Sequence, residues 1–251
     1  MRRSSLVARR LSLVARRLSL GARRSSLVAR RPSLARLSLV ARRSSLLALL
    51  AATTLAAADL PKITYTKVFT GSTPPFVEIV VDKEGHGVYK EATNDDNPMA
   101  FVLSPEESAA VFELAAKLDH FTKPLESPIK VAFMGDKIFR WENGSEKHET
   151  KFNYSQVPEA QALWDWFERI AETEQRYAVL ESATHFDRLG VNQALLELEA
   201  TYDRKRLVAA AQFLPLLDRI AASEHFMHMA RERAAALADV IRNPPPKAKG
   251  Q

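Results

Sequence analysis

The chain contains no cysteine, which excludes disulfides, thiolate metal ligands and thiol nucleophiles. No uninterrupted apolar stretch reaches the ~20 residues that a transmembrane helix needs. Gly-x-Ser-x-Gly and glycine-rich phosphate-binding motifs are absent as well. What is present is a chain of 251 residues, 46% hydrophobic and 26% charged, as in globular proteins stabilised by burial of apolar surface. No familiar catalytic motif therefore defines an activity.

Acidic residues are missing from the first 58 positions, which hold 13 arginines. Residues 59–251 consequently hold 23 basic and 30 acidic residues. The net charge of +6 thus divides into +13 for the first segment and −7 for the rest. Nucleic-acid binding requires cations clustered on the folded part. We therefore expect no nucleic-acid partner for residues 59–251, which form the mature chain if the preceding segment is removed.

The N-terminal 40 residues form a basic repeat of the type Arg-Arg-x-Ser-Leu-Val-Ala. Arginine pairs recur every seven residues, at positions 2–3, 9–10, 16–17, 23–24 and 30–31. As a helix, this repeat would line up the pairs on one face and suit an anionic membrane surface or nucleic acid. A mitochondrial presequence is a second interpretation. We favour a third, in which residues 1–40 are a tandem DNA repeat translated from an over-long gene start.

Residues 41–58 have the three parts of a secretory signal peptide. An arginine pair is followed by a short Leu- and Ala-rich run, and Ala56 and Ala58 are the small residues that precede a cleavage site. We predict cleavage after Ala58 and export to the periplasm or the cell exterior. The mature protein would begin at Asp59.

The composition changes near residue 157, because residues 59–157 contain five glycines whereas residues 158–243 contain only Gly190. Alternating apolar residues predict strands in the first part, at 63–69, 76–81, 88–91, 99–103, 130–134, 137–141 and 147–152. The second part has helical spacing. The fold class predicted is α+β: an antiparallel β-meander sheet with one helix, followed by an antiparallel helical bundle. Residues 244–251 are predicted to form a disordered tail.

Local signals mark the ends of these elements. Ser104 and Glu107, three residues apart, predict a capping box at the start of the first helix. Asn143-Gly144 predicts a hairpin with a type I′ turn. The last strand is so charged that we expect it at a sheet edge.

The helical part has three apolar stripes and one further cap. The stripes are Leu163, Phe167, Ile170, Tyr177 and Leu180; Val191, Leu195, Leu198 and Tyr202; and Phe213, Leu217 and Ile220. Pro215 should lie near the start of the third helix, and Ser223 is predicted to cap a fourth helix that ends near Asn243. If the three stripes pack against each other, a fragment of residues 158–243 should stay helical when it is expressed alone. The alternative is that Trp164 and Phe167 pack into the β-rich half.

The residues of 70–82 and 87–90 also carry a resemblance. They are similar to the opening of small domains of unknown function in exported bacterial proteins, which begin with a Gly-x-x-Pro turn, a strand, a glycine turn and a Tyr-containing return strand. The cysteines that some of these domains carry in the turn are missing here. The helical half, from Trp164 onward, resembles uncharacterised secreted bacterial proteins. The resemblance implies export and supplies no catalytic residue.

Glu224, His225 and His228 are the candidate metal ligands. On a helix, His225, His228 and Met229 would share a face. Imidazole with thioether suits copper, and imidazole with carboxylate suits zinc. His185 is a candidate further ligand. We favour the alternative, that these are packing or surface side chains.

Three functions from different classes follow. The first is a non-catalytic binding or interaction module of the cell envelope, whose sheet edge and helix faces bind an unknown protein or small molecule. The second is a soluble copper or zinc protein that uses the His-x-x-His pair of the last helix. The third is an envelope hydrolase in which His86 or His148 acts with carboxylates such as Glu84 and Glu149. We favour the first.

Overall fold

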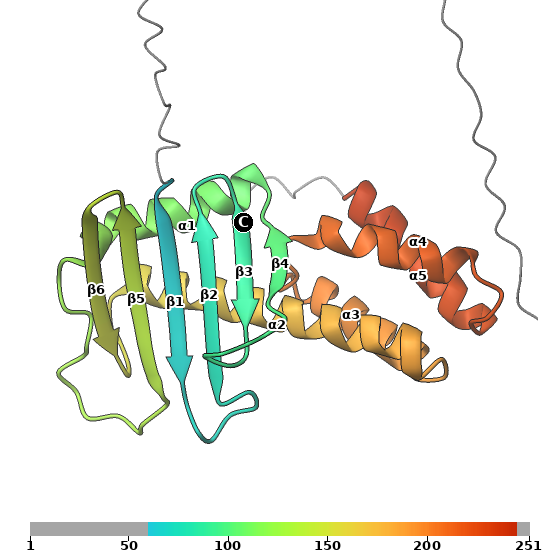
Figure 1. Ribbon diagram of the computed structural model, residues 1–251, viewed down its shortest axis with the longest axis horizontal. Coiled ribbons are helices and arrows are strands. Elements are labelled where there is room, and N and C mark those ends of the chain that lie inside the picture. The colour runs from blue at the N-terminus through green and yellow to red at the C-terminus, as the bar shows by residue number, and fades with distance from the viewer. Residues whose placement is uncertain (1–59, 245–251) are drawn as a thin grey trace, which may run out of the picture. The chain divides into compact units, whose positions relative to one another are not determined.

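The computed structural model describes residues 60–244. The basic repeat, the predicted signal peptide with its cleavage site, and residues 245–251 of the tail lie outside the described residues. The fold is α+β, as predicted: a six-stranded antiparallel sheet carries helices on one face and is followed by a helical part (Figure 1). Within the described range, no helix is long and apolar enough to cross a membrane.

Six strands form the sheet in the order β4-β3-β2-β1-β5-β6. They are β1 Lys62–Val68, β2 Phe76–Asp82, β3 His86–Lys90, β4 Met99–Val102, β5 Asp136–Asn143 and β6 Glu146–Phe152. The first four form the predicted meander. Strand β5 pairs with β1 instead of β4, because the chain first crosses the sheet through a helix. The charged β6 lies at one edge, as predicted, and the short β4 lies at the other.

Within residues 60–244, five α-helices and two short 3-10 helices accompany the sheet. They are α1 Pro105–Lys117, η1 Asp119–Phe121, α2 Pro158–Phe186, α3 Val191–Asp203, η2 Ala210–Phe213, α4 Leu214–Ala222 and α5 His228–Arg242. The capping box of α1 is confirmed: Ser104 N donates to Glu107 Oε2 at 2.8 Å, and Glu107 N donates to Ser104 Oγ at 3.3 Å. Pro215 lies in the first turn of α4, where a proline removes no helical hydrogen bond.

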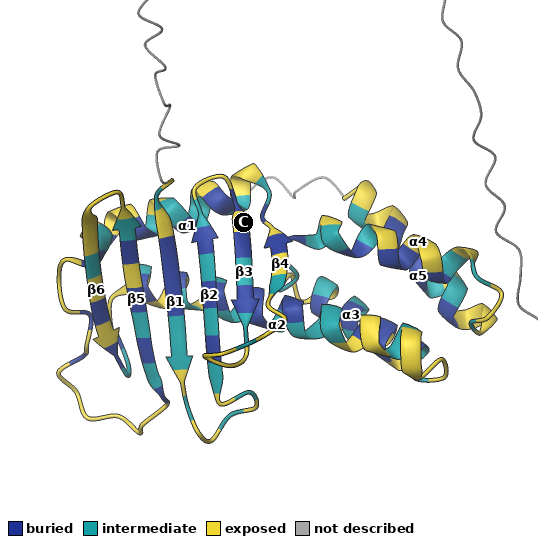
Figure 2. Cartoon of the chain, in the orientation of Figure 1, coloured by how far each residue is buried: buried dark blue, intermediate teal, exposed yellow. Residues whose placement is uncertain are grey.

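The sheet buries one face against α1 and the first half of α2. Strand residues alternate between buried and more exposed positions along the strands (Figure 2). Phe139 lies at the centre, and its ring centroid is 5.1–5.9 Å from those of Tyr65, Phe121, Phe152 and Phe167. Because Phe167 belongs to α2, this aromatic cluster joins the helix to the sheet.

A second core lies among the later helices. Its buried members are Leu180, Val191, Ala194, Leu195, Leu198, Phe213, Leu216, Leu217, Ile220, Ala230, Ala234, Leu237 and Ala238. The 29-residue helix α2 therefore serves both cores, the first with Leu163, Phe167 and Ile170 and the second with Leu180. The β-rich and helical parts share this helix.

Three local predictions are wrong. Residues 130–134 form no strand, because β5 is already paired on both sides, with β1 and β6. Ser223 is the C-cap of α4, and α5 begins only at His228. The predicted hairpin exists, but Asn143 pairs with Glu146 in the ladder, and Gly144 alone in this turn has positive φ, at 58°. A type I′ turn needs two such residues.

Candidate interaction site

Strand β4 is the edge of the sheet that no charged side chain protects. Its four residues are Met-Ala-Phe-Val, whereas β6 at the opposite edge carries five charged or imidazole side chains in seven residues. Natural sheet edges usually carry lysine, proline or a cover that prevents pairing with another chain. The β4 edge lacks charge and is therefore suited to accept a further strand.

The ladder determines which backbone groups of β4 are free. Leu103 N donates to Gly85 O at 2.9 Å, so the polar groups of Leu103 point toward β3. In an antiparallel pair these directions alternate, which turns the groups of Phe101 toward β3 and those of Ala100 and Val102 outward. Val102 is also 56% exposed. Two amide and two carbonyl groups thus line the open side of β4.

A groove of about 400 Å³ runs along this edge. One wall is residues 100–104, and the other is residues 209–212, Ala-Ala-Ala-Gln. Alanine side chains leave room beside the strand. The one charged group in the lining is the carboxylate of Glu107, which also caps α1.

Glu107 connects the two walls. Its carboxylate accepts from Ser104 N on the strand side and from Ala209 N on the other, with oxygen distances of 3.2 and 3.3 Å to the latter. Ala209 has the left-handed φ of 48° that an L-residue seldom adopts. We infer that the capping carboxylate sets the spacing of the groove.

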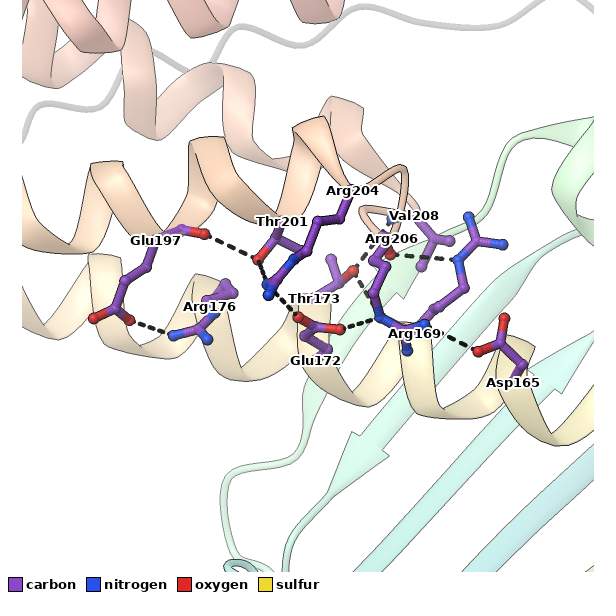
Figure 3. A network of polar contacts seen from close by, with 10 residues as sticks. All are labelled: Asp165, Arg169, Glu172, Thr173, Arg176, Glu197, Thr201, Arg204, Arg206 and Val208. Carbon is purple, nitrogen blue, oxygen red and sulfur yellow. Dashed lines mark hydrogen bonds and ion pairs between the residues drawn. The ribbon is translucent and has the colours of Figure 1, made fainter.

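The segment that leads into the alanine wall is tied to α2 by charged side chains (Figure 3). Arg206 Nε donates to Glu172 Oε2 at 2.6 Å, and Arg206 Nη1 donates to Asp165 Oδ1 at 3.0 Å. Arg204 Nη2 donates to the other oxygen of Glu172 at 3.1 Å. These pairs are partly exposed and individually weak, but together they hold residues 204–208 in one arrangement.

Two uncharged contacts complete this attachment. Val208 N donates to Thr173 Oγ1 at 3.2 Å, and Thr173 Oγ1 donates in turn to Arg169 O at 2.8 Å (Figure 3). Val208 and Thr173 are both fully buried. The alanine wall therefore follows a segment that contacts α2 through Arg204, Arg206 and Val208.

Glu174 on α2 contacts the same wall through Gln212. It is 1% exposed, and Gln212 Nε2 donates to its Oε1 at 2.8 Å, while no group of residues 60–244 donates to its Oε2. Burial without a cation raises the pKa of this carboxyl to about 7. The hydrogen bond from Gln212 thus ties the last residue of the alanine wall to a buried carboxyl of α2.

A second cavity, of about 180 Å³, has more charged residues in its lining, and its buried carboxylate, Glu168, is already hydrogen-bonded within the chain. Glu168 accepts from Tyr65 Oη at 2.9 Å, from Lys67 Nζ at 2.9 Å and from Trp164 Nε1 at 3.0 Å. Burial raises its pKa, but these donors outweigh burial and lower the pKa below the usual value. Because its partners already lie within the chain, we assign this cluster to cohesion of sheet and helix.

The candidate metal residues do not share a helix. Glu224 and His225 lie in the turn before α5, so the premise that His225 and His228 occupy one helical face is wrong. His228, in the first turn, has its Nε2 at 3.1 Å from Glu232 Oε1 and a side chain that is 80% exposed. Across residues 60–244, no three side chains of metal-ligating type come together. The copper or zinc site stays a prediction.

The two histidines considered for hydrolysis, His86 and His148, differ in how they lie relative to their carboxylates. His86 Nδ1 is 3.2 Å from Asp82 Oδ2 and 3.9 Å from Glu84 Oε2, on an exposed turn. His148 pairs with Trp141 on β5, and Glu149, the next residue on β6, points to the opposite face and binds Arg140 at 2.6 Å. The side chains of His148 and Glu149 therefore leave β6 in opposite directions, although both residues line one pocket of about 300 Å³ at this edge.

Sequence reasoning missed both Glu107 as a site residue and the alanine wall. The run Ala209-Ala-Ala before an apolar stripe was the available signal, but alanine runs also suit helices. No protein-family model matches this chain, and no curated protein matches it either.

Proposed function

We propose that this chain is a non-catalytic binding module of the cell envelope that accepts an extended peptide segment of a partner protein beside β4. The observation that supports the proposal is the outward row of backbone groups of Ala100 and Val102 next to an alanine-lined groove. Backbone hydrogen bonds would provide affinity, and the groove would select small or apolar side chains at alternate positions.

A proline at position 102 tests this mode of binding. Decapeptides are first selected from a displayed random library for binding to the chain that starts at Asp59. Their affinity for the Val102→Pro variant should be at least tenfold lower than for the parent chain, because proline has no amide hydrogen. Proline is tolerated where the amide of an edge strand points to solvent, so the fold should be kept. Fluorescence anisotropy measures the affinity.

Val102→Thr is the matched control, since it keeps the amide and the branched side chain. Its affinity should stay within twofold of the parent. Selected peptides that bind Val102→Pro as tightly as the parent chain would contradict strand addition at β4.

Export is the second part of the proposal, supported by the pattern of residues 41–58. Expressed with its own leader in a bacterium, the protein should be recovered from the periplasm or the medium, and N-terminal sequencing should begin at Asp59. Recovery from the cytoplasm with residues 1–40 attached would overturn this part and favour the interpretation of the repeat as a basic helix.

A further inference from the structure

The end of α2 exposes a large aromatic side chain beside an open groove. Phe186 is 88% exposed, and Leu189, just after the helix, is 75% exposed. The groove next to them, between α2 and α3, has a volume of about 500 Å³. Half of its lining residues are small: Ala178, Ser182, Ala183, Gly190 and Ala194. An exposed phenylalanine at the rim of such a groove is typical of a docking surface.

A second cleft, of about 390 Å³, lies on the other side of the same helix turns. It is bounded by the loop between β3 and β4 and shares Ala178, Ser182 and Phe186 with the groove. The groove and the cleft are therefore parts of one continuous surface around Phe186, which we call the Phe186 surface.

The cleft side of the Phe186 surface is acidic. Its lining includes Glu91, Asp95 and Glu181. None of the three forms an ion pair with another of the residues 60–244. Glu91 accepts only from Tyr89 Oη, at 2.7 Å, and Asp95 accepts from backbone amides of its own loop. These carboxylates, with His185 in the same lining, thus lie without an ion-pair partner from residues 60–244 next to an apolar groove.

We propose that the Phe186 surface binds a basic segment of a partner protein that carries an apolar anchor. The anchor would enter the small-residue groove against Phe186, and its arginines or lysines would face the carboxylates of the cleft. The charge of −7 on residues 59–251 favours the encounter with such a segment.

This inference rests on the proposed function and adds the chemistry of the partner. Met99 is the first residue of β4 and also lines the acidic cleft. A segment paired along β4 would therefore reach the Phe186 surface at that end of the strand. The two surfaces are lined by different residues otherwise, which allows them to be tested separately.

The test uses one peptide of the required chemistry, a synthetic copy of residues 9–24, which has six arginines, four leucines and no acidic residue. Fluorescence anisotropy measures its binding to the chain that starts at Asp59. We expect binding that weakens with added salt and that falls about tenfold for Phe186→Ser and for Glu181→Lys. A peptide with all six arginines replaced by glutamine should not bind.

Glu113→Lys is the matched control for charge, because Glu113 is an exposed helical glutamate on α1 whose replacement alters the net charge equally. The affinity of the peptide for Glu113→Lys should change only as much as the altered net charge of the protein explains. Absence of binding by the peptide, or equal losses for Glu113→Lys and Glu181→Lys with none for Phe186→Ser, would overturn the inference.

Val102→Pro separates this inference from the proposed function. Loss with Phe186→Ser but not with Val102→Pro supports the Phe186 surface and contradicts pairing at β4 for this ligand. Loss with Val102→Pro alone contradicts the Phe186 surface and supports strand addition. Loss with both supports one segment that spans the two.

Discussion

Replacing Glu174 with glutamine should stabilise the protein at pH 8 by up to about 3 kcal/mol, the value that corresponds to a pKa raised from 4.5 to about 7. The carboxyl is 1% exposed, and within the described part of the chain Gln212 is its one hydrogen-bond donor and no cation pairs with it. Glutamine keeps an oxygen for Gln212 and carries no charge. The penalty of an ionised, half-satisfied carboxylate would therefore disappear.

The pH dependence of this effect has a definite sign. The folded protein holds the Glu174 proton more tightly than the unfolded chain. The contribution of this residue to the free energy of unfolding is therefore fully present below pH 4.5 and is lost as the pH rises to about 7. The neighbouring tyrosines, Tyr89 and Tyr177, have pKa values raised by burial and stay neutral throughout. The stability of the parent chain should consequently fall between pH 4.5 and 7 relative to Glu174→Gln.

Urea unfolding of both proteins at pH 4.5, 6 and 8 measures the difference. Glu172→Gln is the control, because Glu172 lies two residues away on α2 but is paired with Arg204 and Arg206. That variant should be destabilised at pH 8. A Glu174→Gln protein with the same stability as the parent at pH 8 would show that Glu174 is solvated or paired in solution.

The parts of the fold that could be predicted depend on local patterns. The capping box at Ser104 needs only two residues three apart, and it formed as predicted. The charge of β6 predicted an edge strand because a central strand would bury those charges. In both cases the deciding residues are neighbours in the sequence.

Residues 130–134 show where local pattern is insufficient. Their apolar run suits a strand, but β5 has no free side, and the segment is held instead as an irregular loop. Met134 N donates to Asn153 Oδ1 at 2.7 Å, and the buried Lys137 donates to Asn153 O at 2.8 Å. Which strands are already paired is a property of the whole sheet.

The candidate site likewise depends on contacts between residues that are far apart in the sequence. Glu107 and Ala209 are 102 residues apart, and the groove exists only because both approach the end of β4. The sequence predicted a sheet edge as a binding surface but had no signal for which edge or for its second wall. The acidic cleft likewise joins the β3–β4 loop to the end of α2.

A fragment of residues 158–243 should lose the first half of α2 while keeping the second core. Leu163, Phe167 and Ile170 are fully buried against the sheet and α1, and exposing each costs about 1.5–3 kcal/mol. A free stretch of some four helical turns is marginal in water without such contacts. The apolar stripe that predicted an independent helical part therefore serves two different cores along one helix.

Hydrogen exchange followed by NMR would locate the loss. Amides of 160–171 should exchange freely in the fragment and be protected in the chain that starts at Asp59. Amides around Leu198 and Leu217 should be protected in both, because the second core, from Tyr177 to Ile241, lies entirely within the fragment. A shorter fragment, 175–243, should match the helical circular dichroism of the longer one per molecule. Protected amides at 160–171 in the fragment would instead mean that the stripes close on each other, and that the change in glycine content near residue 157 marks a domain boundary.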